Sequence, residues 1–124
     1  MTWYLPRSAQ APGLARRCLA EALPDISAQA RDVVDLLVTE TVTNAVRHGS
    51  GPVTMELFTT SSGVRVAVRD DGSRMPQQRL SSALEEGGRG LQIVAALATE
   101  WGVTPSRTGG GKTVWFEVGV SVSA

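Results

Sequence analysis

Residues 40–49 read Glu-Thr-Val-Thr-Asn-Ala-Val-Arg-His-Gly and close a long helical pattern of apolar residues. At 100° per residue, Val33 and Leu37 share the sector that we expect to face the core. Glu40 and Asn44 are four residues apart, so their side chains stack on that same face. An unpaired carboxylate or amide is costly to bury. The pattern therefore predicts either a ligand site on this helix, or polar groups at the edge of the stripe that reach solvent or pair with an arginine.

The boundaries of this helix follow from its flanking residues. Asp25 or Ser27 can accept hydrogen bonds from the free N–H groups of the first turn. The sequence Gly-Ser-Gly-Pro at 49–52 is a stop signal, so the helix should end near His48. The side opposite the core is expected to face water. It carries the polar residues Asp32, Asp35, Thr39 and Thr43.

Apolar patterns of period two or 3.6 predict the other elements. In chain order they are strand Trp3–Leu5, helix Ser8–Leu23, strands Val53–Thr59 and Val64–Asp70, helix Leu91–Ala98 continued by Trp101, and strand Thr113–Val120. Ser-Ser-Gly at 61–63 is typical of a hairpin turn. This order favours the α+β class, as a two-layer α/β sandwich. We expect one domain over residues 1–124, because no linker or repeat interrupts the pattern.

The composition excludes several classes of protein. Hydrophobic residues make up 42% of the 124 and charged residues 19%, the balance of an ordered globular chain. A net charge of zero gives no electrostatic reason to bind nucleic acid directly. No apolar run approaches the ~18 residues of a membrane helix, and the start has no secretory pattern, so we expect no membrane association. The single cysteine, Cys18, excludes an internal disulfide and fits a cytoplasmic protein.

Two further breaks in the pattern carry polar or flexible residues. The strand expected at 64–70 ends its inward row of valines on Asp70, whose carboxylate needs a donor; a strand end followed by the Asp71–Gly72 turn is the simple alternative. Gly-Gly-Arg-Gly at 87–90 precedes a helix, whose first N–H groups suit phosphate, although such a run is also typical of a flexible loop. Gly-Lys-Thr at 111–113 imitates a P-loop end, but a strand follows it, so we interpret it as a turn.

These features occur in a fixed order along the chain: Glu40-x-x-x-Asn44, Asp70-Asp71-Gly72, Gly88-Arg89-Gly90-Leu91 and Gly111 to Phe116. In that order they resemble the ATP-binding domain shared by histidine kinases, a class of heat-shock chaperones, DNA gyrase and MutL. The run at 40–49 is similar to the anti-sigma-factor serine kinase branch, especially its small stand-alone actinobacterial type. The resemblance extends roughly from Leu5 to Val118. It implies a Bergerat-type fold, with a mixed, mostly antiparallel sheet and helices on one face.

The resemblance also implies a role for each matching residue. Glu40 would be the general base. Asn44 would bind Mg²⁺, and Asp70 would accept from the adenine amino group of ATP. The other residues implied at the nucleotide are Arg47, Gly72, Gly88, Arg89, Gly90, Leu91 and Thr113. Residues 73–87 would form a lid, in which Arg74 replaces a glycine usual in the family.

By this resemblance, the chain is a protein serine/threonine kinase that phosphorylates a STAS-type antagonist. Free of the antagonist, it would bind a sigma factor and so control transcription by partner switching. Members of the branch often form homodimers, and the oligomeric state stays open. The alternatives are a non-catalytic ATP-dependent interaction module, a weak ATPase without a protein substrate, and a nucleotide-free scaffold. Glu40 favours the kinase, because a binding module needs no base at that position.

Overall fold

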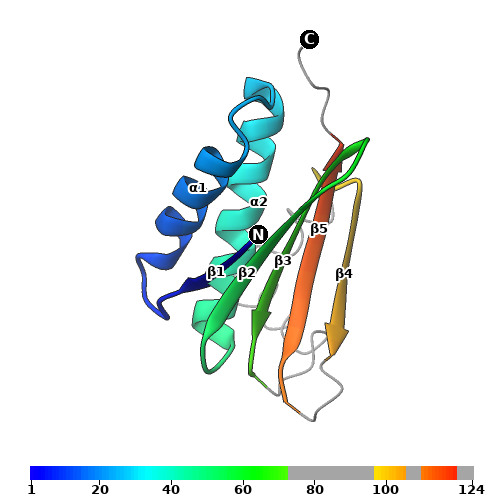
Figure 1. The fold of residues 1–124 in the computed structure, drawn as a ribbon. Coiled ribbons are helices and arrows are strands. Elements are labelled where there is room, and N and C mark those ends of the chain that lie inside the picture. Colours follow the sequence, from blue (N-terminus) through cyan, green and yellow to red (C-terminus); the bar gives the residue numbers. More distant parts are fainter. Residues whose placement is uncertain (73–96, 106–109, 120–124) are drawn as a thin grey trace.

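The computed structural model describes residues 1–72, 97–105 and 110–119. Within these ranges, two helices cover one face of a five-stranded sheet (Figure 1). The elements are β1 (Thr2–Leu5), α1 (Ala11–Ala22), α2 (Ala28–His48), β2 (Val53–Thr59), β3 (Gly63–Asp70), β4 (Glu100–Pro105) and β5 (Lys112–Gly119). This arrangement confirms the predicted α+β fold with helices on one face. Neither helix is long and apolar enough to cross a lipid bilayer, within the ranges given.

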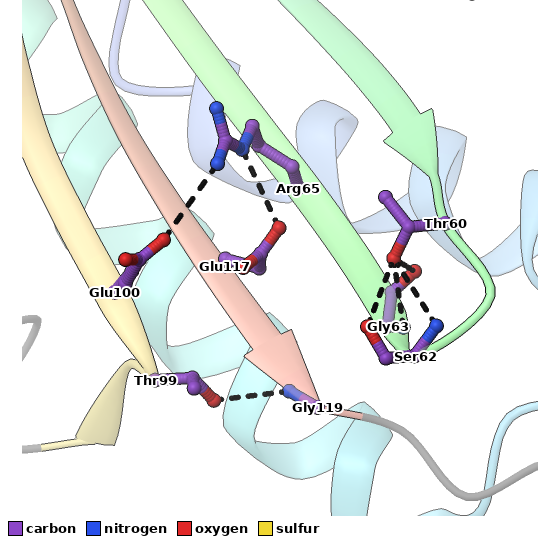
Figure 2. A network of polar contacts seen from close by, with 8 residues as sticks. All are labelled: Thr60, Ser62, Gly63, Arg65, Thr99, Glu100, Glu117 and Gly119. Carbon is purple, nitrogen blue, oxygen red and sulfur yellow. Dashed lines mark hydrogen bonds and ion pairs between the residues drawn. The ribbon is translucent and has the colours of Figure 1, made fainter.

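The sheet has the spatial order β1-β2-β3-β5-β4, and all the pairings between these described strands are antiparallel. β2 and β3 form the predicted hairpin. In its turn, Thr60 Oγ1 accepts the N–H groups of Ser62 at 3.3 Å and Gly63 at 3.0 Å (Figure 2). β3 also pairs with β5, far along the chain, and the last register position sets Asp70 opposite Lys112.

Both ends of α2 are fastened by side-chain hydrogen bonds. Of the two capping candidates, Ser27 is the cap, because its hydroxyl accepts the Ala30 N–H at 3.1 Å. At the other end, the Gly49 N–H donates to the Ala45 carbonyl at 3.0 Å. The Arg7 guanidinium donates to the Ala45 carbonyl at 3.0 Å and to the Gly49 carbonyl. A cation suits a helix C-terminus, so the segment after β1 holds the end of α2 in position.

The buried stripe of α2 consists of Ala30, Val34, Leu37, Val38, Thr41, Val42 and Ala45. Val33, expected in the core, is only half-buried at its edge. The prediction that the opposite side faces water was wrong for Asp35, Thr39 and Thr43, which are half-buried. α1 packs there, and Arg16 Nη1 donates to Thr39 Oγ1 at 2.7 Å. Periodicity identifies an apolar face, but it does not reveal a second helix that packs on a polar one.

A charged network lies on the sheet face away from the helices (Figure 2). Arg65 Nε lies 3.5 Å from Glu117 Oε1, and Arg65 Nη2 lies 3.8 Å from Glu100 Oε2. The guanidinium also lies 4.2 Å from the ring centroid of Trp115. Gly102, paired with Trp115, leaves room for the indole, since a Cβ there would come within 2.8 Å of it. Arg65 therefore connects β3 with β4 and β5 through partly exposed contacts, each of which is weak.

The prediction that the helix beginning at Leu91 continues to Trp101 was wrong at its C-terminal end. Residues 91–96 lie outside the described ranges, Leu97 is helical, and Trp101 belongs to strand β4. Trp101 pairs with Phe116 and packs against the core. β4 lacks a clear strand pattern because this edge strand reads Glu-Trp-Gly-Val-Thr-Pro, is at most half-buried, and contains a glycine and a proline.

The half-buried carboxyl of Asp35 predicts a pH-dependent stability. Burial raises the pKa of Asp35, while Arg31 and Arg16 act in the opposite direction. The native state then holds the proton more tightly than the unfolded state does. Ionised Asp35 therefore destabilises the fold at neutral pH, and this penalty is lost as the pH falls through the native pKa. We expect Asp35→Asn to raise the urea midpoint at pH 7, with a gain that shrinks toward pH 4.

Glu21→Gln is the matched control, because Glu21 lies exposed on α1 and does not contribute to the shift of Asp35. It should leave the midpoint unchanged at both pH values. If Asp35→Asn instead lowers the midpoint at pH 7, the two arginines outweigh burial and the argument is wrong.

Candidate functional site

Asp70, at the end of β3, is the buried centre of the candidate site. It is 1% exposed, as its inward strand position predicted. Its Oδ1 accepts the Gly72 backbone N–H at 2.7 Å and Lys112 Nζ at 2.8 Å. Lys112 is itself only 3% exposed, so the two charges meet where either one alone would be strongly unfavourable. The donors that this carboxylate needs are therefore supplied by the chain.

Glycines let the backbone close in around Asp70 and Asp71. A Cβ on Gly49 would lie 2.5 Å from Asp70 Cγ, and one on Gly111 would lie 2.6 Å from the Asp70 carbonyl oxygen. A Cβ on Gly51 would lie 2.6 Å from Asp71 Oδ2. Gly51 and Gly111 also adopt φ angles of 68° and 97°, which side chains disfavour. The end of α2 thus lies directly against the Asp70 carboxylate, and the start of β5 lies against the Asp70 backbone.

Glu40 and Asn44 lie one turn apart on α2 and are half-buried beside the core stripe. In the described part of the chain, neither side chain has a hydrogen bond or an ion pair. Polar groups removed from water normally have partners. We call these two residues the Glu40–Asn44 row. Because both are only half-buried, they can bond water, as the edge-of-stripe alternative expects, or a ligand.

The Glu40–Asn44 row faces away from α1. At 100° per residue, it shares its side of α2 with Val33, which lines a hollow with Thr99 and Val118 beside the end of β5. α1 packs on the other side of the helix, at Thr39. The row therefore points over the β5 side of the sheet, and it leads toward the helix end that contacts the buried carboxylate.

The other residues that the resemblance implies at the nucleotide do not all lie near Asp70. Gly72 is buried and bonded to Asp70, where backbone could approach a ligand. Arg47 is exposed and lines a groove with Ser8 and Pro12 near the start of α1. Outside the described ranges lie Arg74, Gly88, Arg89, Gly90 and Leu91.

Lys112, rather than Thr113, faces Asp70. Along β5 the side chains of Lys112 and Phe116 are buried toward the helices, so strand alternation puts Thr113 on the opposite face. This register does not bring the Thr113 hydroxyl to a base held at Asp70. The sequence interpretation missed Lys112 because lysine is rarely buried. The available signal was its position two residues before Val114, in the inward row of the last strand.

Residues 5–118 match the histidine kinase-like ATPase domain family. The chain belongs to this family. Among solved structures, it is similar to the histidine kinase domain of a blue-light activated histidine kinase from Erythrobacter litoralis. That match has 22% identity and a TM-score of 0.57, and it covers 89% of this chain and 59% of the other. It is also similar to the Acinetobacter baumannii histidine kinase AdeS, with 15% identity, a TM-score of 0.53, and coverage of 98% and 68%.

These structural likenesses show a shared fold, and the chain spans 59% of the first of the two. No curated protein matches the chain. Membership of the ATPase-domain family supports an ATP-binding regulatory role of the kinase or ATPase type, usually with Mg²⁺. The described residues contain no group of three or more His, Cys, Asp or Glu that could hold a metal. Mg²⁺ still fits, because it commonly binds through phosphates and water with one or two protein ligands.

The contact between Gly49 and Asp70 predicts a steric effect of one methyl group. We expect Gly49→Ala to destabilise the chain by about 1–3 kcal/mol, the usual cost of overpacking. Urea unfolding followed by tryptophan fluorescence measures it. Gly13→Ala is the control, because its Cβ would meet nothing closer than Arg16 Nη2 at 3.6 Å. Alanine favours a helix, so this variant should gain up to ~1 kcal/mol. Equal stability changes in the two variants would contradict the close approach.

Proposed function

We propose that the chain binds ATP with its adenine at Asp70 and its phosphates along the Glu40–Asn44 row, and transfers a phosphoryl group to a serine or threonine of a partner protein. The row is the observation that carries this proposal. Two half-buried polar side chains without described partners lie on the helix whose end contacts Asp70. Such groups can bond a ligand in place of water, and family membership supplies the class of ligand.

The surroundings of Asp70 fit a planar base. A carboxylate is an acceptor, so it can bind the exocyclic amino group of adenine. Gly72 presents backbone without a side chain directly after Asp70, which would let the base approach closely. Thr113, which the resemblance implies beside the base, would have to act from the other sheet face or through its backbone.

Asn44 fits a Mg²⁺ ligand, because its amide oxygen is a hard donor and has no other described partner. When bound, the ion would neutralise charge on the phosphate oxygens. From the resemblance, we also assign phosphate contacts to Arg47, which would turn away from the α1 groove. The remaining assigned phosphate contacts are Gly88, Arg89, Gly90 and Leu91.

Glu40 fits a general base in phosphoryl transfer. It precedes Asn44 by one helical turn, about 5.4 Å along the axis, on the side away from Asp70. A hydroxyl beyond the γ-phosphate would meet this carboxylate. Glu40 would accept the hydroxyl proton as the oxygen bonds to phosphorus and ADP leaves. A base of this kind contributes a factor of ~10²–10⁴ to the rate.

The proposed substrate is a STAS-type antagonist, as in the anti-sigma-factor branch that the sequence resembles. Phosphorylation would add charge at the contact and release the antagonist. The chain would then be available to a sigma factor. Homodimer formation belongs to the same proposal.

Replacement of Glu40 tests the kinase assignment. We expect Glu40→Gln to lower phosphoryl transfer from labelled ATP to a STAS protein by at least ~10²-fold, while ADP affinity stays within threefold. Glu56→Gln is the control, since Glu56 is similarly half-buried but belongs to β2, whose alternation puts it on the other face of the sheet. Equal transfer by wild type and Glu40→Gln would exclude the assigned role.

Two other results would select the alternatives. Tight ATP binding by the wild-type chain, with no transfer to any STAS protein, would indicate a non-catalytic interaction module. Phosphate release without a partner would indicate an ATPase.

Replacement of Asn44 tests the metal assignment. We expect Asn44→Ala to abolish the gain in ATP affinity that Mg²⁺ gives the wild type, because the variant lacks the amide oxygen. Calorimetry with and without Mg²⁺ measures this difference. Thr43→Ala is the control, since Thr43 lines the groove near α1 instead. An undiminished Mg²⁺ effect in Asn44→Ala would place the metal ligand elsewhere.

A further inference from the structure

The groove that Arg47 lines has a volume of about 250 Å³ and lies between the start of α1 and the end of α2. None of its lining residues is buried, so all of them can meet a ligand from solvent. They are Ser8, Ala9, Pro12, Thr43, Val46 and Arg47. A cavity of ~150 Å³ can hold a benzene molecule. The groove can therefore seat one apolar side chain of a ligand, such as leucine or phenylalanine.

The apolar part of the groove is formed in advance by packed elements. Pro12 lies in the first turn of α1, and Val46 lies in the last turn of α2 and packs against the core. The Arg7 guanidinium holds that last turn, because it donates to the carbonyls of Ala45 and Gly49. A side chain that enters the groove meets surface that is already ordered, and this lowers the entropy cost of binding.

The charge beside this apolar seat is positive. Residues 1–20 and 41–55, which include the whole lining, contain no Asp or Glu, although the net charge of the chain is zero. In the described part of the chain, the exposed Arg47 side chain has no hydrogen bond or ion pair. Arg7 precedes the lining residue Ser8 and bonds to carbonyls, so its charge also lacks a carboxylate partner. The groove is therefore complementary to an acidic ligand.

We propose that this groove docks an acidic segment of a partner protein, with one apolar side chain seated between Pro12 and Val46 and a carboxylate bonded to Arg47. Arginine donates two parallel N–H groups to a carboxylate, and acidic motifs are commonly recognised by arginines. A purely apolar ligand would leave Arg47 without an anion. An inorganic anion would leave the apolar seat empty. The two features together select a protein segment that carries both groups.

This docking surface goes beyond the proposed nucleotide site and does not depend on it. Arg47 lies seven residues after Glu40, so at 100° per residue the two point in nearly the same direction from α2. The Arg47 side chain nevertheless lines the groove. In the proposed function its guanidinium turns to the phosphates of a bound nucleotide. The experiment therefore uses the chain without nucleotide.

An NMR titration of the ¹⁵N-labelled full chain with synthetic peptides tests the inference. The probe is the acidic peptide Glu-Glu-Leu-Glu-Glu. It should shift the amide resonances of Ala9 and Val46, and the shifts should saturate at millimolar peptide. A glycine in place of the leucine, or lysines in place of the glutamates, should each weaken binding by ~10-fold or more, because each removes one of the two kinds of contact.

Variants of the chain test the two halves of the groove. Arg47→Gln should weaken binding of the acidic peptide by ~10-fold or more, the usual loss of a charge-assisted hydrogen bond. Arg17→Gln is the matched control, since Arg17 is an exposed arginine of α1 outside the lining. It should change the affinity less than about twofold, because distant exposed charges are screened.

A second pair of variants covers the case in which Arg47→Gln does not fold. Ala9→Glu adds a carboxylate at an exposed position inside the groove and should abolish binding of the acidic peptide. Gln10→Glu adds the same charge at an exposed position outside the lining, and it should retain binding.

Three results would overturn the inference. Equal weakening by Arg47→Gln and Arg17→Gln would reduce the effect to net charge. Equal shifts of the Ala9 and Val46 resonances with inorganic phosphate would show an anion site in which the apolar seat plays no part. Resonances that stay unmoved with the acidic peptide would exclude the acidic segment, and a dimer that Ala9→Glu dissociates would then identify a second copy of the chain as the occupant.

Discussion

The fold depends on one close contact, between the end of α2 and the end of β3. Gly49 has no side chain, so the last turn of α2 approaches the Asp70 carboxylate to a distance that no Cβ could share. Arg7 holds the same turn by its carbonyl groups. Because a helix is rigid over this length, the contact also fixes the direction in which every earlier residue of α2 points. The position of the Glu40–Asn44 row is therefore set from the end of the helix.

The sequence predicts those features of the fold that depend only on residues close together in the chain. The bounds of β2, the inward row of β3 ending on Asp70, and the Ser27 cap each depend on a few neighbouring residues. The rest depends on tertiary partners. Thr39 was expected in water because nothing near it in sequence reveals that α1 covers it. Lys112 could be recognised only with the register between β3 and β5, which joins residues 42 positions apart.

α2 has three sides with different partners, and this division connects the fold with the proposed chemistry. One side is apolar and packs on the sheet. A second side is polar but bonded to α1 through Arg16. Only the third side, with Glu40 and Asn44, lacks described partners. Packing against the sheet and against α1 stabilises the helix. The third side is therefore not needed for stability, and in the proposed function it binds the ligand. The fold is shared with histidine kinases at low identity, and in the proposed function the chemistry would come from this third side.

Lys112 is the only lysine of the chain, and its burial has a consequence for covalent marking of the chain. Its only other amine is the N-terminus, which donates to the Leu57 carbonyl at 3.2 Å. Acetylation, or tagging through an isopeptide bond, requires a lysine amine that an enzyme can reach, and Lys112 is inside the protein. Any such mark on a lysine could be added only after the start of β5 separates from β3. Lysine modification of this chain would therefore record a loss of native structure, and it could not regulate the folded state.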